Sequence, residues 1–240
     1  MDLGISGRRA AVAAASKGLG FGVANALAAE GVHVAICGRD QATVDDAARR
    51  IGNETVPIVA DVSTVDGAVG FVQQARDALG GIDILVPNAG GPPPGDFAQT
   101  TVDQYLDAFT LNCHGAIAMC YETVPAMQAQ RWGRVVALTS IAVRQPIANL
   151  ILSNTARAGL TGFLRTLARE VAADGVTVNS LLPGLHATER TKALHVDPES
   201  LTLGNPADFG AFAAFLCSES ARFVTGTAIQ VDGGAYAALL

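Results

Sequence analysis

The chain has 240 residues, half of them hydrophobic, with a formal net charge of -6 and a sequence pI near 5.1. This length favours one large domain with a core on both faces of a sheet and is short for two. The acidic balance leaves no basic face for nucleic acid, and no apolar run reaches the roughly 20 residues that span a bilayer. Because the N-terminus carries no signal-peptide pattern, we expect a cytoplasmic protein that contacts neither nucleic acid nor membrane.

The four cysteines stand far apart in the sequence and form no CxxC motif. They are Cys37, Cys113, Cys120 and Cys217. Buried, reduced thiols are the simplest interpretation for such a set in a cytosolic protein. No histidine has the spacing of a metal ligand, so we expect no metal site.

Seven short apolar runs recur along the chain with room for a helix between them. They cover residues 10–15, 32–37, 55–61, 83–90, 134–140, 176–184 and 228–234. Continuous apolarity indicates strands buried on both faces. Several intervening helical stretches end at a glycine, and one begins at Ser63 as its expected N-cap. We therefore predict an α/β fold in which residues 1–240 form one Rossmann-type doubly wound domain, a seven-stranded parallel sheet with helices on both faces.

A glycine-containing loop follows the first predicted strand and leads into a helix. It contains Ser16, Lys17, Gly18, Leu19 and Gly20. Glycines at this point let backbone N–H groups approach a pyrophosphate at the helix N-terminus, where the helix dipole favours an anion. A tight turn with no ligand is the alternative interpretation.

The second predicted strand ends at Gly38 and Arg39. In dinucleotide-binding folds an acidic residue here accepts hydrogen bonds from the adenosine ribose, whereas its absence beside an arginine accommodates a 2′-phosphate. With Lys17 as a second cation, this pattern indicates a preference for NADP(H) over NAD(H). The alternative is a pair of solvated surface cations.

One stretch, TSIAVRQPIANLILSNTARAG, carries Ser140, Ser153 and Arg157. Its spacing resembles the active site of the short-chain dehydrogenase/reductase family, in which serine is followed by tyrosine and lysine at these positions. The glycine loop resembles the family's TGxxxGxG motif, with Ala13 and Ala14 in place of threonine and the first glycine. The chain is similar to the 3-oxoacyl-[acyl-carrier-protein] reductases of this family. It resembles a divergent member, because it lacks the tyrosine and the lysine.

The resemblance implies roles for further residues. It places Asp61 and Val62 against adenine, and it places Asn88, Ala89 and Gly90 beneath the adenine-side ribose. Asn112 is expected in the active site, and Pro183, Gly184 and Thr188 are expected around the nicotinamide carboxamide. Asp232, Gly233 and Gly234 match the family's C-terminal turn. Together with the glycine loop and Arg39, these fragments follow one another along the chain in the same order as in the family. The implied fold and cofactor agree with those expected from the residues themselves.

Catalysis is where the chain departs from the family. A serine hydroxyl at position 153 is far less acidic than a phenol with a pKa of roughly 10, so Ser153 does not replace the proton donor. Arg157 keeps the positive charge and suits ribose hydroxyls, but it cannot relay a proton. The resemblance implies an NADP(H)-dependent oxidoreductase that delivers hydride to a carbonyl or activated carbonyl with an atypical proton donor. Ser140, Asn112, Ser153 and Arg157 are the candidate catalytic residues.

Other assignments stay open at this stage. His186 is either a substitute proton donor or a loop residue pointing at water, and Tyr105 is either a second phenol or part of the core. A Ser-His-Asp hydrolase is disfavoured because neither Ser140 nor Ser153 lies in G-x-S-x-G. The main rival is a non-catalytic relative that binds nucleotide or a protein partner.

The substrate side of the site is defined only loosely. A short lid is expected at about residues 188–204, and Pro146, Ile147, Leu150 and Ile151 offer an apolar wall, which suggests a small carbonyl compound. The resemblance also implies a homotetramer or homodimer built on the helices that begin near Tyr105 and Ser153.

Overall fold

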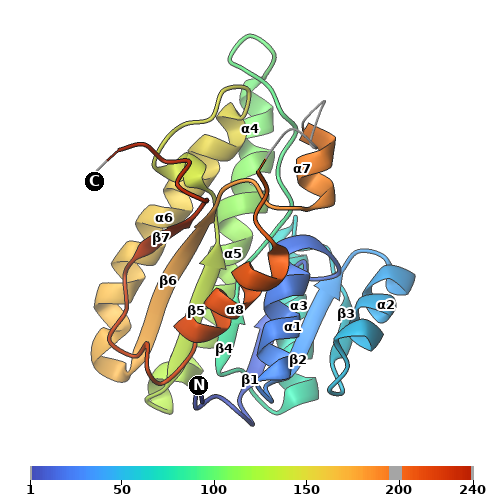
Figure 1. The fold of residues 1–240 in the computed structure, drawn as a ribbon, viewed down its shortest axis with the longest axis vertical. Coiled ribbons are helices and arrows are strands. Elements are labelled where there is room, and N and C mark those ends of the chain that lie inside the picture. The colour runs from blue at the N-terminus through green and yellow to red at the C-terminus, as the bar shows by residue number, and fades with distance from the viewer. Residues whose placement is uncertain (1, 195–201, 239–240) are drawn as a thin grey trace.

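A computed structural model describes residues 2–194 and 202–238 of the chain (Figure 1). In these ranges the predicted single domain is present, with one seven-stranded parallel sheet. Each predicted apolar run overlaps one strand, and β1, β2 and β5 extend one residue beyond their runs. The strands are β1 (Arg9–Val12), β2 (His33–Gly38), β3 (Val56–Val59), β4 (Ile84–Val86), β5 (Gly133–Leu138), β6 (Val176–Pro183) and β7 (Ala228–Val231).

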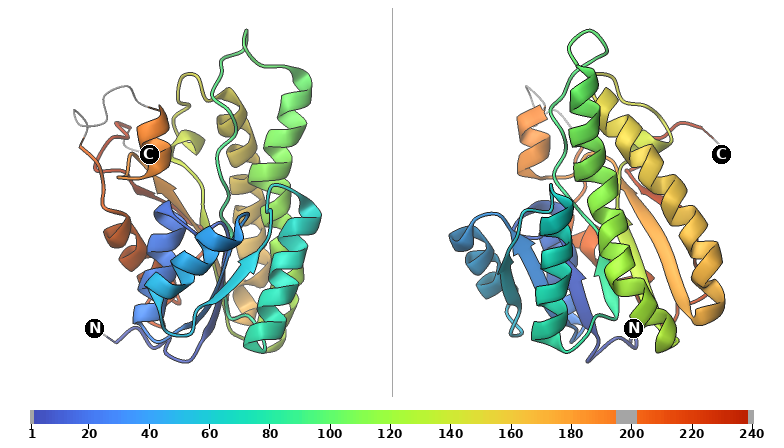
Figure 2. Two further views of the ribbon diagram at one scale, coloured as in Figure 1. Left: turned by 90° about the vertical axis from the view of Figure 1, so that its right-hand side faces the viewer. Right: turned by 180° about the vertical axis from the view of Figure 1, so that it is seen from behind.

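Helices cover both faces of the sheet. They are α1 (Gly18–Ala29), α2 (Gln41–Ile51), α3 (Val65–Leu79), α4 (Val102–Phe109), α5 (Gly115–Ala129), α6 (Ile151–Val171), α7 (Glu189–Leu194) and α8 (Pro206–Leu216), with a π-helical turn at Thr110–His114 and 3-10 turns at Ile141–Val143 and Ala172–Asp174. One face carries α1, α2 and α8, and the other carries α3, α5 and α6 (Figures 1 and 2). The two layers bury separate hydrophobic clusters against the sheet.

The strands are ordered β3-β2-β1-β4-β5-β6-β7. The chain winds outward from β1 in both directions, so the order reverses between β1 and β4, where Val12 pairs with Val86. In doubly wound sheets the loops at the carboxyl ends of such strands diverge and leave a ligand-binding crevice. This is the edge of the sheet at which the site lies.

Burial follows the sequence pattern. Every residue of β4 and β5 is buried, whereas the edge strands β3 and β7 are partly exposed. Central strands lie between two helical layers and need apolar side chains on both faces, which explains their unbroken apolar runs. Where α1 meets α8, Gly22 lies against the carbonyl of Pro206 so closely that any side chain there would collide with it.

One helix cap differs from the prediction, and part of the predicted lid lies outside the described residues. The helix expected to begin at Ser63 is α3, and its N-cap is Thr64, whose hydroxyl accepts a hydrogen bond from the Gly67 N–H at 3.0 Å. Ser63 instead lies in the preceding turn, where its N–H donates to Asp61, so the expected cap was wrong by one residue. Residues 195–201 of the expected lid lie outside the described residues, and α7 occupies its first part.

All four cysteines are buried and free, as expected. Burial raises the thiol pKa of Cys37, Cys120 and Cys217 to about 12 each, so these groups stay protonated at neutral pH. In the described ranges, no helix combines the length and apolarity needed to cross a membrane.

Candidate active site

A cleft of about 1240 Å³ opens at the carboxyl edge of the sheet, between the loops after β1 and β4 and helix α7. It is lined by every residue expected to hold the cofactor. These are Ser16, Lys17, Gly18, Leu19, Gly20, Arg39, Asp61, Val62, Asn88, Ala89, Gly90, Arg157, Pro183, Gly184 and Thr188. The fold brings them together because each follows the end of a parallel strand or starts the helix after it.

The glycine loop presents the N-terminus of α1 to the cleft. Lys17 is the N-cap of α1, and its side chain does not cap the first turn, so the first N–H groups of the helix stay available to an anion. Gly20 is required by packing, because a side chain there would meet the Ala14 carbonyl and the Asn88 amide at less than 3.0 Å. This geometry fits a dinucleotide pyrophosphate.

Ala14, at the family's first glycine position, has a φ of 47°. This is the left-handed region, which costs a residue with a Cβ about 1 kcal/mol or more. The loop is held in this shape from both sides. The Ala14 N–H points at Cys37 Sγ at 3.2 Å, and Asn88 Nδ2 donates to the carbonyls of Ala13 and Ala14 at 3.1 and 3.2 Å.

The adenosine end of the cleft lies at the ends of β2 and β3. Arg39 and Asp61 both line it. Burial by itself would raise the pKa of the Asp61 carboxyl, but hydrogen bonds from Ser63 and the charge of Arg39 outweigh burial and lower that pKa. Asp61 is therefore ionised at neutral pH, and the Arg39 guanidinium lies in its field.

Ser140 lies after β5 and lines the cleft. Its Oγ accepts a hydrogen bond from the Ala142 N–H at 3.1 Å, which fixes the oxygen at the start of a 3-10 turn. A hydroxyl that already accepts a bond keeps its own O–H free to donate. Ser140 can thus donate a hydrogen bond to a ligand oxygen in the cleft.

Ser153 and Arg157 lie one turn apart near the start of α6, and both are only 8% exposed. The Arg157 guanidinium donates to Ser153 Oγ at 3.3 Å and to the carbonyls of Leu138 and Thr139 at 3.0 and 3.1 Å. Burial, and secondarily the like charge of Arg190, lowers the pKa of Arg157 to about 10. The guanidinium remains charged at neutral pH, at the end of β5 and beside Ser140.

Asn112 does not line the cleft, unlike the other candidate catalytic residues. It is 3% exposed and lies in the π-helical turn between α4 and α5. Its Nδ2 donates to the Gly90 carbonyl at 2.7 Å, and its Oδ1 is buried without a partner among the described residues. The side chain contacts the cleft through Gly90, and a catalytic role for Asn112 stays a prediction.

The histidine considered as a substitute acid does not point at water. His186 is 4% exposed, and its ring packs edge-on against Phe209 with 5.1 Å between the ring centroids. Its Nδ1 lies 3.1 Å from the Gly184 carbonyl, which favours the tautomer with the proton on Nδ1. Tyr105 packs with Ala108 and Leu152 between α4 and α6, as part of the core.

Several cleft residues were not anticipated from the sequence. Arg190, on α7, lines the cleft and donates from Nη2 to the Pro92 carbonyl at 2.9 Å. A cation just after Thr188 was the only sequence signal for Arg190.

Of the expected apolar wall, Pro146, Ile147 and Leu150 line the cleft. Ile151 packs with the Tyr105 cluster instead, because it starts α6 on the face toward α4.

The cleft is basic in an acidic protein. Its lining has four basic side chains, Lys17, Arg39, Arg157 and Arg190, and two acidic ones, Asp61 and Glu189. Such a lining attracts anions even though the chain as a whole carries a charge of -6. Within the described part of the chain, no three His, Cys, Asp or Glu side chains gather closely enough to hold a metal ion.

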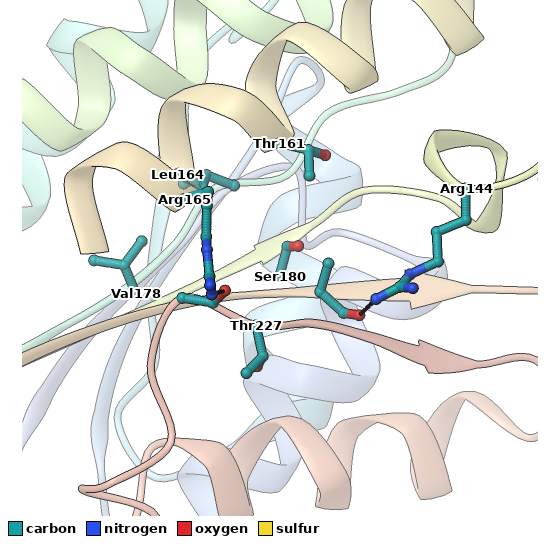
Figure 3. Close-up of a pocket in the computed structure, with 9 residues that line it drawn as sticks. Arg144, Thr161, Leu164, Arg165, Val178, Ser180 and Thr227 are labelled. Carbon is teal, nitrogen blue, oxygen red and sulfur yellow. Dashed lines mark hydrogen bonds between the residues drawn. The ribbon is translucent and has the colours of Figure 1, made fainter. Parts of the chain in front are cut away.

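A second, smaller hollow of about 370 Å³ lies between α6, β6 and β7 (Figure 3). Arg165 reaches into it from α6 and Arg144 from the segment after β5. Both arginines are already bonded to main-chain carbonyls, Arg165 to Gly226 and Arg144 to Ala228 at 3.1 Å. The hollow has less than a third of the volume of the cleft, and none of the predicted site residues lines it, so the basic cleft is the candidate site.

This sheet, the glycine loop on a helix N-terminus and the crevice at the point of reversed strand order define a dinucleotide-binding domain of the doubly wound class. The family model described as enoyl-(acyl carrier protein) reductase matches residues 13–236. Human dehydrogenase/reductase SDR family member 4 is 33% identical, with 96% of this chain and 88% of the relative aligned. The 3-oxoacyl-[acyl-carrier-protein] reductase of Vibrio cholerae is 28% identical over 98% of this chain and 99% of its own length.

A solved structure of L-sorbose reductase from Gluconobacter frateurii, complexed with NADPH and L-sorbose, superimposes with a TM-score of 0.92 at 30% identity and covers all of both chains. The chain belongs to the short-chain dehydrogenase/reductase family and is an oxidoreductase of that type. The family and fold predicted from the sequence are confirmed.

Proposed function

We propose that the chain is an NADP(H)-dependent reductase of activated carbonyl compounds that works without the family's tyrosine. The observation that carries the proposal is the set of cofactor candidates along one basic cleft, with Ser140 and Arg157 at its inner end. The likeness to a reductase solved with NADPH supports the choice of cofactor. NADPH, when bound, supplies the hydride.

The residues present fit this cofactor. The open N-terminus of α1 suits the pyrophosphate, and Arg39 with Lys17 suits a 2′-phosphate, because guanidinium and phosphate form bidentate charged hydrogen bonds. Gly38 leaves room beside Ser16, whose Oγ would lie 3.1 Å from any Cβ at that position. We assign the nicotinamide end to the segment that contains Pro183, Gly184 and Thr188.

At the reacting end, two groups of this chain stabilise negative charge on the substrate oxygen. The Ser140 hydroxyl donates to that oxygen, and the buried Arg157 guanidinium adds a positive field that water screens poorly. Neither group gives up a proton, so the proton that completes the alcohol comes from solvent. Loss of a positioned general acid typically lowers a rate by about 10²–10⁴.

The proposed substrate class follows from the absence of a positioned general acid. Quinones, dicarbonyls and conjugated enones form anions that are intrinsically stable, whereas simple ketones form alkoxides that require immediate protonation. We therefore assign the first group as substrates. The apolar wall of Pro146, Ile147 and Leu150 suits a small, partly apolar molecule.

We further propose that the protein self-associates through α4, α5 and α6; α4 continues into α5 end to end, and α6 lies beside them on the face opposite α1 (Figure 2). Val102, Leu106 and Tyr121 are 85%, 72% and 74% exposed there. Large apolar side chains gathered on one face are typical of a subunit interface.

The test is a fluorescence titration with NADPH and NADH, followed by addition of 2,3-butanedione and measurement of NADPH oxidation. Tighter binding of NADPH and turnover that Ser140→Ala lowers at least tenfold are expected. Binding of NADPH without oxidation by a panel of dicarbonyls, quinones and enones would instead support the non-catalytic rival.

A further inference from the structure

Two guanidinium groups that line the cleft, the buried Arg157 and the more exposed Arg190, have only neutral hydrogen-bond acceptors. Arg157 donates to Ser153 Oγ and to two carbonyls at the end of β5, and Arg190 donates to the Pro92 carbonyl. Neither arginine forms an ion pair with any residue that the structure describes. A buried cation such as Arg157 without a carboxylate partner is unfavourable unless a ligand compensates its charge.

The acidic side chains of the cleft are engaged elsewhere. Asp61 lies at the adenosine end, in the field of Arg39. Glu189 pairs with Lys192 on the exposed side of α7, with 3.1 Å between Oε1 and Nζ. The positive charges of Arg157 and Arg190 are therefore not neutralised within the described cleft, and each disfavours the other.

Arg190 is not among the groups assigned to the cofactor phosphates. The phosphates are assigned to the N-terminus of α1 and to Arg39, which follow β1 and β2, whereas Arg190 lies against the loop after β4. Its guanidinium packs on Gly91, where an added Cβ would come within 3.0 Å of it, and its bond to Pro92 fixes the orientation. Most of its five N–H donors remain available, which suits a carboxylate held by two parallel hydrogen bonds.

We propose that the substrates of this chain are short oxo acids, whose carboxylate Arg190 binds while Arg157 and Ser140 lie at the reacting carbonyl. This inference rests on the proposed reductase function and narrows its substrates to anions. The carbonyl of a 2-oxo acid is activated toward hydride by the neighbouring carboxyl carbon. The alkoxide that it forms is stabilised by Arg157 and Ser140 until solvent protonates it.

The experiment compares 2-oxobutanoate with its methyl ester as substrates for NADPH oxidation. The ester has the more electrophilic carbonyl, so a higher kcat/KM for the acid requires recognition of the carboxylate. Arg190→Gln should lower kcat/KM for the acid by about 10- to 100-fold and change that for the ester less than about threefold, and Arg190→Lys should retain part of the preference. Lys192→Gln is the matched control, because it removes a cation from the same helix that does not line the cleft.

A binding measurement separates this inference from the reductase assignment. Oxamate carries a carboxylate but is not reduced, and its binding to the NADPH complex is followed by cofactor fluorescence. Weaker oxamate binding in Arg190→Gln, with NADPH binding unchanged, supports the carboxylate site even if no substrate oxidises NADPH. Reduction of the ester as fast as the acid, or an equal effect of Arg190→Gln on both, would overturn the carboxylate site and leave the reductase function standing.

Discussion

Arg157 Nε donates a hydrogen bond to Ser153 Oγ at 3.3 Å, so the two residues that replace the family's tyrosine and lysine contact each other. In this arrangement the serine oxygen accepts from a cation, which disfavours its action as a base, and its hydroxyl is far too weak an acid to replace the tyrosine. The guanidinium is held by this bond and by two strand carbonyls at the end of β5. We propose that the pair provides fixed charge near Ser140 instead of proton transfer.

The glycine loop offers the first prediction. Ala14→Gly removes the strain of a φ of 47°, partly offset by the greater freedom of glycine in the unfolded chain. We expect the variant to be more stable by up to about 1 kcal/mol, which raises Tm by roughly 2–4 °C. Thermal denaturation measures this. Ala129→Gly, at an exposed position in α5, is the control and should lower Tm, and a lower Tm for Ala14→Gly would contradict the account.

The second prediction concerns the preference for NADPH over NADH. Arg39→Ala removes the group proposed to bind the 2′-phosphate, and the loss of a charged hydrogen bond costs about 1.5–3 kcal/mol. The Kd for NADPH should rise about 10- to 100-fold while the Kd for NADH changes little. Arg49→Ala, which removes an exposed arginine paired with Asp46 on α2, should change neither. Equal affinity of the unmodified protein for both cofactors would refute the preference.

An ion pair at the opposite end of the sheet governs the acid sensitivity of the fold. Burial alone would raise the pKa of Asp83, but hydrogen bonds from the Arg9 side chain and backbone and from Gln130 outweigh it and lower that pKa. The Arg9 fork reaches both carboxylate oxygens at 2.7 and 2.8 Å. A lowered carboxyl pKa contributes stability above the unfolded-state value of about 3.9, and this stability is lost as the pH falls through the folded-state value.

Asp83→Asn should therefore lower the free energy of unfolding at pH 7 by about 2 kcal/mol. Below pH 4 the difference between variant and unmodified protein should shrink. Urea denaturation at pH 7 and at pH 3 measures both values. A difference that stays constant with pH would show that the Asp83 charge does not provide the stabilisation.

The exposed apolar face offers the fourth prediction. Leu106→Glu places a charge one turn from the exposed Val102 and Phe109 on α4 and should convert an oligomer into a monomer in sedimentation analysis. Gln41→Glu, at an exposed position on α2, is the control and should leave the assembly unchanged. An unmodified protein that is monomeric at micromolar concentration would remove the basis for this interface.

Much of this site could be predicted from the sequence, because its residues follow strand ends. Gly18, Arg39, Asp61 and Pro183 each lie at the end of an apolar run or shortly after it, and parallel strands place all such positions at one edge. Their convergence depends on topology alone and not on side-chain packing.

Other features depend on tertiary contacts that have no local pattern. Asn112 is turned beneath the cleft by a π-helical turn, and His186 is buried by Phe209 from a distant helix. Arg190 is brought to the cleft by a short helix whose position is fixed by the loop after β4. Neither periodicity nor spacing in the sequence encodes these placements.

The most direct test restores the missing pair. NADPH oxidation is measured for the unmodified protein and for Ser153→Tyr with Arg157→Lys, using a simple ketone and a quinone. Because only the ketone needs a proton donor during hydride transfer, the double substitution should raise kcat/KM for the ketone by about 10²-fold or more and change that for the quinone far less. Reduction of the ketone by the unmodified protein as fast as by the double variant would show that another acid acts, and would contradict the account.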